Sequence, residues 1–126
     1  MRKALMIDNA ARAAGHYSHA IVANGFVFVS GQGPVDPATG KMSDNFAEQV
    51  RQTLRNVDTI LKGAGTDLSN AVKVNTYLTD LTRFAEYNEV YKEFFPAAPP
   101  ARTTVGSQLH GILVEIDCIA VIPEKA

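Results

Sequence analysis

The sequence predicts an α+β fold in which two helices cover one face of a sheet of five or six strands. Apolar residues recur at intervals of three and four in two segments, residues 46–64 and about 83–95, whereas the other apolar segments alternate with a period of two. The order along the chain is strands, helix, strand, helix, strands. The 126 residues fit one domain of ordinary size, so we expect a single domain over residues 1–126.

The first third of the chain is predicted to form three strands. Residues 3–7 form the first, and residues 20–23 pair with residues 26–30 in a hairpin. The hairpin turns at Asn24-Gly25, a dipeptide that adopts positive φ at little cost. A second turn is predicted at residues 36–40, which read Asp-Pro-Ala-Thr-Gly.

The first helix covers the most regular apolar pattern of the chain, residues 46–64. Asp44 or Asn45 is expected to cap its start, and Glu48 is placed to complete a capping box. Gly63 or Gly65 is expected to end it.

A strand over residues 72–78 and a helix over about 83–95 follow. In the strand, Val74, Thr76 and Leu78 share one face with Val72, and Tyr77 lies on the other. The helix carries a stripe that we interpret as core, and Pro96 stops it. The stripe consists of Phe84, Tyr87, Tyr91 and Phe94.

Two further strands bring charges into apolar surroundings. Pro99 and Pro100 keep the backbone extended into a strand that carries Arg102. In the last strand, residues 113–121, one face is wholly apolar and the other carries Glu115 and Asp117. The apolar face holds Val114, Ile116, Cys118 and Ala120, and the charged face also holds Leu113, Ile119 and Val121.

A carboxylate in such a strand is usually paired, hydrogen-bonded or used in chemistry, because a charge is costly to desolvate. Two interpretations of Glu115 stay open on these grounds: a structural ion pair with Arg102, or a functional site. Two helices cover only one face of a sheet, so the charged face would expose a large apolar patch. Such patches usually mark interfaces, and we therefore expect a homo-oligomer with a pocket at or beside the subunit boundary.

Composition excludes several classes of function. The net charge of −1 and the lack of a basic run give no electrostatic case for binding nucleic acid or an anionic membrane. No apolar stretch reaches the roughly 18 residues of a membrane span, and the N-terminus lacks the pattern of a secretory signal, so we expect a cytoplasmic protein. The single cysteine, Cys118, lies on the apolar face and is expected to be buried rather than nucleophilic.

Four motifs in order resemble those of the RidA/YjgF reactive-intermediate deaminases. They are Gly15-His16-Tyr17-Ser18-His19-Ala20, Val29-Ser30-Gly31-Gln32-Gly33-Pro34 with Asp36-Pro37-Ala38-Thr39-Gly40, Asn88 followed by Tyr91 and Phe94-Phe95, and Pro100-Ala101-Arg102-Thr103 running into Val114-Glu115-Ile116-Asp117. The resemblance covers about residues 15–122. It implies a chorismate-mutase-like α+β fold with one mixed sheet, assembled as a homotrimer with ligand sites between subunits. It also implies hydrolysis of 2-imino or 2-enamino acids, released by pyridoxal-phosphate enzymes, to 2-keto acids and ammonia without a cofactor.

The resemblance also assigns roles to residues. Arg102 matches the arginine that binds the substrate carboxylate, in a bidentate geometry that suits a guanidinium. Glu115 matches the glutamate that activates water, a role that a raised pKa would favour. The remaining matches are substrate-binding residues: Tyr17, Ser30, Gly31, Asn88, Thr103 and Thr104.

Departures from the family pattern leave the substrate open. His16 and His110 stand where proline is usual, Thr104 stands where cysteine is common, and the interval from Arg102 to Glu115 is about two residues short. No metal site is expected, because no Cys, Asp or Glu cluster completes a set with the three histidines, His19 included. Two rival functions stay open: a regulatory trimer that binds small carboxylates without turnover, and an RNA-acting protein.

Overall fold

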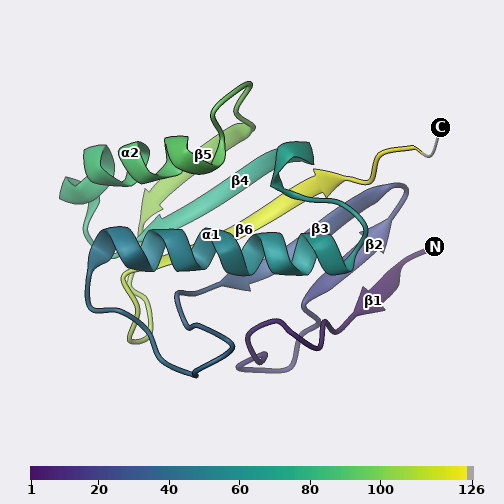
Figure 1. Ribbon diagram of the computed structural model, residues 1–126, viewed down its shortest axis with the longest axis horizontal. Helices are drawn as coiled ribbons and strands as arrows, with labels where there is room; N and C mark the ends of the chain where they lie inside the picture. The colour runs from purple at the N-terminus through teal and green to yellow at the C-terminus, as the bar shows by residue number, and fades with distance from the viewer. Residues whose placement is uncertain (125–126) are drawn as a thin grey trace.

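Six strands form one mixed sheet within residues 1–124, the part of the chain that this computed structural model describes. They are β1 (Lys3–Leu5), β2 (Ala20–Ala23), β3 (Phe26–Gln32), β4 (Ala71–Leu78), β5 (Ala101–Gly106) and β6 (Val114–Val121), in the spatial order β1-β2-β3-β6-β4-β5. Only β4 and β5 pair in parallel. Helices α1 (Phe46–Gly63) and α2 (Phe84–Phe94) lie on one face of this sheet (Figure 1), which confirms the predicted α+β class.

The turn between β2 and β3 has the predicted chemistry. Asn24 has a φ of 51° and Gly25 a φ of 79°, the left-handed conformation that these two residue types tolerate best. The first strand was predicted over residues 3–7, but β1 ends at Leu5. Ile7 leaves the sheet, and its N–H donates to the Nδ1 atom of His19 instead.

Both helices begin and end where local signals place them. The Asn45 side chain accepts a 2.9 Å hydrogen bond from the backbone N–H of Glu48, which makes Asn45 the N-cap of α1. Gly65, with a φ of 93°, follows the end of α1. A 3-10 turn, η2 (Leu81–Arg83), leads into α2, whose last residue precedes Pro96 by two positions. A second 3-10 turn, η1 (Leu68–Asn70), precedes β4.

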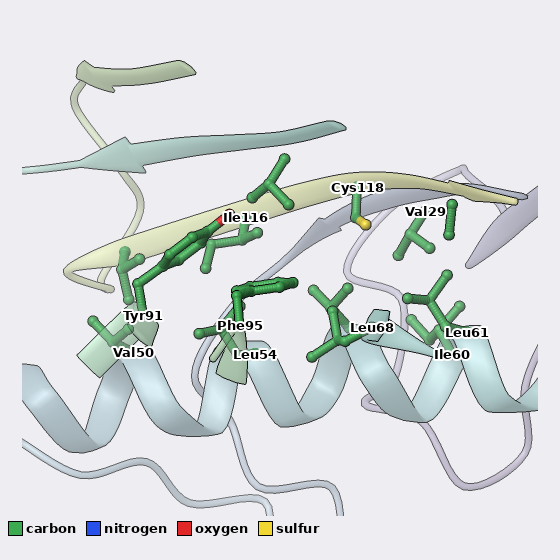
Figure 2. Packing of buried hydrophobic residues seen from close by; sticks show 14 of the residues in the cluster. Val29, Val50, Leu54, Ile60, Leu61, Leu68, Tyr91, Phe95, Ile116 and Cys118 are labelled. Carbon is green, nitrogen blue, oxygen red and sulfur yellow. The ribbon is translucent and has the colours of Figure 1, made fainter. Parts of the chain in front are cut away.

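The core fills the space between the helices and the sheet. Figure 2 shows Val50, Leu54 and Ile60 of α1 pointing toward β6, the strand that carries Ile116 and Cys118. The rings of Tyr91 of α2 and of Phe95, the residue after α2, lie between helix and strand. The thiol of Cys118 is buried, and burial raises its pKa to about 12. This confirms the expectation that Cys118 is a core residue. No helix of residues 1–124 has the length and apolarity that crossing a membrane requires.

The other face of the sheet has no helix on it and exposes apolar side chains. Phe26 pairs with Val121 and Phe28 with Ile119, and the two rings are 39% and 42% exposed. We call these four residues the helix-free patch. Leu113, which was expected on this face, is wrongly placed by the sequence pattern: β6 begins one residue later, and Leu113 packs against the core.

Candidate active site

The predicted site residues fall into two groups on opposite faces of the sheet. Arg102 of β5 pairs with Val74 of β4, whose side chain is buried under the helices. Glu115 of β6 pairs with Tyr77, an odd position of β4 that faces away from the helices. The expectation of an ion pair between Arg102 and Glu115 is therefore wrong within one chain, because the sheet separates the two side chains.

Arg102 lies on the aromatic rings of α2. Its guanidinium carbon is 4.7 Å from the ring centroid of Tyr91, 5.2 Å from that of Tyr87 and 5.5 Å from that of Phe84. Such stacking holds a guanidinium electrostatically while it stays partly exposed. One Nη atom donates a 2.8 Å hydrogen bond to the Oδ1 atom of Asn88. Asn88 thereby fixes the orientation of the fork, which keeps further N–H groups for a carboxylate.

A cavity of about 470 Å³ opens beside this guanidinium, and we call it the arginine cavity. Its walls are formed by Ala85, Asn88, Glu89, Tyr91, Lys92, Phe95, Pro99, Pro100 and Arg102. The hydroxyl of Tyr91 is buried without a hydrogen-bond partner among the described residues. Burial also raises the pKa of Tyr91, so the group stays a neutral O–H donor. Figure 2 shows this hydroxyl pointing toward Ile116 of β6, so it lies in the core.

Glu115 lies beside a bulge in β3. Val29 pairs with Cys118 and Gln32 with Ile116, so two residues of β3 occupy the space opposite one residue of β6. One of the two is Gly31, where an added Cβ would lie only 2.6 Å from the Oε2 atom of Glu115. The glycine thus makes room for the carboxylate.

Tyr17 and Ser30 lie with Gly31 and Glu115 around a hollow of about 200 Å³. The hydroxyl of Ser30 donates to the carbonyl oxygen of Ser18 at 2.7 Å, so its proton is committed to the backbone. The hydroxyl of Tyr17 accepts a 3.0 Å hydrogen bond from the backbone N–H of residue 14 and keeps its own proton for donation.

A larger cavity of about 440 Å³ continues from this hollow, and we call it the glutamate cavity. The walls that bear on its chemistry are Arg12, Tyr17, Gly31, His110, Ile112 and Glu115. His110 was identified in the sequence as a departure from the family pattern and as one of three histidines that form no metal set, but not as a substrate-binding residue. Arg12 carried no sequence signal at all, because its loop has no periodic pattern.

The pKa of Glu115 is raised above its ordinary value. Burial is the larger cause, and the negative charge of Asp117, two residues along the same face of β6, is the second. Asp117 is itself fixed by hydrogen bonds from Asn75 at 2.9 Å and from the Tyr77 hydroxyl at 3.0 Å. At a given pH, Glu115 is therefore protonated to a larger extent than an exposed glutamate, and its carboxylate is a stronger base.

The two threonines that follow Arg102 are not brought together. Thr103 lies on the face opposite Arg102, and its hydroxyl accepts a 2.8 Å hydrogen bond from the Nζ atom of Lys73. Thr104 shares the face of Arg102, and its Oγ1 atom is buried without a partner among the described residues. The aromatic stripe of α2, interpreted from sequence as core alone, also supports Arg102. The signal for this role in the sequence is that Phe84 and Tyr91 lie four residues before and three residues after Asn88, on the same face of the helix.

The histidines have structural rather than metal-binding surroundings where their contacts are defined. His19 is buried, accepts a 2.8 Å hydrogen bond from the N–H of Ile7 and bonds the carbonyl oxygen of Ala11 at 2.9 Å. Both ring nitrogens are thus engaged. Residues 1–124 contain no group of three or more His, Cys, Asp or Glu side chains arranged to hold a metal ion.

Comparison with known proteins identifies the family. The family model described as Endoribonuclease L-PSP matches residues 7–122. The chain is 42% identical to a RutC family protein of Pyrococcus horikoshii over 95% of this chain and 98% of that protein. It is 39% identical to the 2-iminobutanoate/2-iminopropanoate deaminase of Bos taurus over 96% of this chain and 90% of the relative.

A solved structure gives the same result. The crystal structure of E. coli TdcF with bound serine superposes with a TM-score of 0.87, at 37% identity, over 93% of this chain and 98% of that one. The family-model match over residues 7–122 includes both groups of site residues. The chain belongs to the RidA/YjgF family.

Proposed function

We propose that this protein hydrolyses 2-imino or 2-enamino acids to 2-keto acids and ammonia, without a cofactor, at sites formed between the subunits of a homotrimer. The observation that carries the proposal is the Glu115 carboxylate, which faces a cavity against Gly31 with a raised pKa. The named activity of the bovine relative and the serine bound to E. coli TdcF agree with a small substrate that carries a carboxylate. The cytoplasmic location stays a prediction.

The chemistry requires one base and one anion site. Arg102 binds the substrate carboxylate, with Asn88 and the rings of α2 fixing its orientation. Glu115 takes a proton from water as the water oxygen bonds to C2 of the imine, whose C=N bond becomes single. The same carboxyl returns the proton to nitrogen, which gives a carbinolamine. Glu115 then moves the hydroxyl proton to nitrogen as the C–N bond breaks, so ammonia leaves and the C–O bond becomes the carbonyl of the 2-keto acid. An enamine is first protonated at carbon to give the iminium, which loses a proton from nitrogen to give the imine.

Two copies are needed because Arg102 and Glu115 lie on opposite faces of one sheet. A contact that joins the arginine cavity of one copy to the glutamate cavity of the next uses different surfaces on the two partners. Such a contact is heterologous, and it closes into a ring when the rotation between copies is that of a threefold axis, as in the proposed homotrimer. The helix-free patch supplies apolar surface for this assembly.

Subunit complementation tests this arrangement directly. Arg102→Ala and Glu115→Gln should each reduce hydrolysis about a hundredfold or more. When the two variants are unfolded, mixed in equal amounts and refolded together, about one site in four pairs an intact Arg102 with an intact Glu115, so activity should return to about a quarter of wild type. Separately refolded variants are the control. Recovery no higher than the separate variants would place both residues in one chain or outside the site.

Glu115 also distinguishes the proposed hydrolase from a regulatory trimer that binds carboxylates without turnover. Glu115→Gln keeps the shape of the side chain, so 2-ketobutyrate binding should survive while turnover falls. Calorimetry and imine hydrolysis on one preparation measure both. An unchanged rate with a lowered melting temperature would show that Glu115 is structural.

RNA cleavage is the second candidate, because the matching family model carries the name of an endoribonuclease. Incubation of the same preparation with single-stranded RNA at two salt concentrations tests it. Cleavage that falls with Arg102→Ala would favour an RNA substrate, whereas salt-insensitive or absent binding would argue against one.

A further inference from the structure

The glutamate cavity is lined by an arginine that the proposed reaction does not use. Arg102 already accounts for the carboxylate next to the imine carbon, yet Arg12 also lines the cavity that contains Glu115. No ion pair or hydrogen bond engages the Arg12 side chain within residues 1–124. The raised pKa of Glu115 has burial and Asp117 as its causes, so Arg12 does not neutralise this carboxylate.

The loop around Arg12 is fixed on both sides. One residue before it, the carbonyl oxygen of Ala11 is bonded by the ring of buried His19 at 2.9 Å. Two residues after it, the N–H of Ala14 donates to the Tyr17 hydroxyl at 3.0 Å. An arginine on an unsupported surface loop would be an ordinary solvated charge. Arg12 is exposed, but these two hydrogen bonds hold the backbone on both sides of it, so the loop loses less entropy when the side chain binds a ligand.

The cavity also has room beyond the reacting atoms. Its volume of about 440 Å³ exceeds what a four-carbon imino acid fills, and most of its remaining wall is apolar, with Ile112, Pro34 and Val35 among the lining residues. In such cavities a few polar groups fix the ligand. Beyond Glu115 the polar side chains on its wall are Tyr17, Gln32, Arg12 and His110, and Arg12 is the arginine among them. The ring of His110 can donate a hydrogen bond in either protonation state.

We infer that Arg12, assisted by His110, recognises a second carboxylate on the substrate side chain, so the preferred substrates are 2-imino acids derived from dicarboxylic amino acids. This inference rests on the proposed function and names its substrate class. In the bound state Arg102 of one copy holds the carboxylate at C1, and Arg12 of the next copy holds the carboxylate at the far end. Glu115 lies between them at C2.

The test compares two imines and two keto acids on wild type, Arg12→Gln, Arg12→Lys and Arg2→Gln. Arg2 is exposed and lies outside both cavities, so Arg2→Gln is a control with the same change in charge. The imines are generated by amino-acid oxidases from aspartate and from 2-aminobutyrate, and kcat/KM is followed by loss of the semicarbazide-trappable imine. Affinity for 2-ketoglutarate and 2-ketobutyrate is measured by calorimetry.

We expect wild type and Arg2→Gln to prefer the dicarboxylic imine and 2-ketoglutarate by about tenfold or more, equivalent to about 1.4 kcal/mol. Arg12→Gln should lose that preference, and Arg12→Lys should retain part of it because it keeps the charge without the fork. Equal losses on both ligands, or no preference in wild type, would overturn the inference. Absence of turnover with a keto-acid preference that depends on Arg12 would instead overturn the proposed reaction, and with it the substrate class, while supporting Arg12 as the group that recognises the second carboxylate.

Discussion

Replacing Gly31 with alanine perturbs the position of Glu115 without changing its chemistry. The added Cβ would lie 2.6 Å from Oε2, 3.0 Å from Cδ and 3.2 Å from Cγ of Glu115. Ordinary contact begins at 3.4 Å, so the carboxylate must move by about 0.8 Å. Displacements of about 1 Å reduce rates by about a hundredfold when catalysis depends on orientation. We therefore expect Gly31→Ala to lower kcat/KM for imine hydrolysis by about ten- to a hundredfold.

The same substitution should leave stability nearly unchanged. Gly31 does not have a positive φ, so alanine fits the backbone, and the atoms that must move belong to the end of a partly exposed side chain. We expect the free energy of unfolding to change by no more than about 1 kcal/mol. Gly106→Ala is the matched control, because its Cβ meets Leu81 at 3.0 Å, outside both cavities. Wild-type activity in Gly31→Ala would refute the claim that the reaction depends on where Glu115 is held.

Three further predictions concern pH, the N-terminal loop and assembly. The acid limb of the kcat/KM profile should have its midpoint above 4.5, since only ionised Glu115 is a base, and Asp117→Asn should move the midpoint toward 4.5. The pKa of Glu115 is higher in the folded chain than in the unfolded chain. Its contribution to stability is therefore complete below the pKa of the unfolded chain and is lost as the pH rises through the pKa of the folded chain. At neutral pH the folded chain holds an ionised, partly buried carboxylate, so Glu115→Gln, which cannot ionise, should melt at a higher temperature than wild type. His19→Ala should lower the free energy of unfolding by about 1–3 kcal/mol, measured in urea, whereas His19→Gln should retain much of it because an amide also donates and accepts. Phe28→Asp should sediment as a monomer, because the assembly would have to bury an unpaired carboxylate. Met42→Asp, at an equally exposed position, should keep the assembly. A wild-type monomer would remove the basis for this expectation.

Local chemistry predicted the elements well because each element has its own signal. The two-residue turn at Asn24-Gly25, the cap at Asn45 and the stop at Pro96 each act within a few residues, so the sequence window contains the cause. The alternation in β6 likewise separated buried from half-buried positions correctly from Val114 onward. It failed at Leu113, because alternation holds only inside a strand and the strand begins one residue later.

The site was predicted less completely because its parts depend on contacts between distant segments. The resemblance pointed to Arg102 and Glu115, each of which lines a cavity, but no pattern in either segment says that β5 and β6 are separated by β4 with their charged side chains on opposite faces. The support of Arg102 by the rings of α2 was missed for the same reason. Arg12 could not be found from sequence, since its place beside the glutamate cavity depends on the contacts of His19 and Tyr17.

The proposed function joins the arginine cavity of one subunit and the glutamate cavity of the next into one site, and this arrangement makes a prediction about assembly. A linear pair of copies would complete one site and leave one arginine cavity and one glutamate cavity unused, with part of each helix-free patch still exposed. A closed ring completes as many sites as it has subunits and leaves no unpaired half-site. Because each site then needs two intact subunits, activity should fall with dissociation rather than with unfolding. Dilution or Phe28→Asp should therefore abolish hydrolysis while circular dichroism still reports a folded chain, and an active, folded monomer would contradict the split-site arrangement.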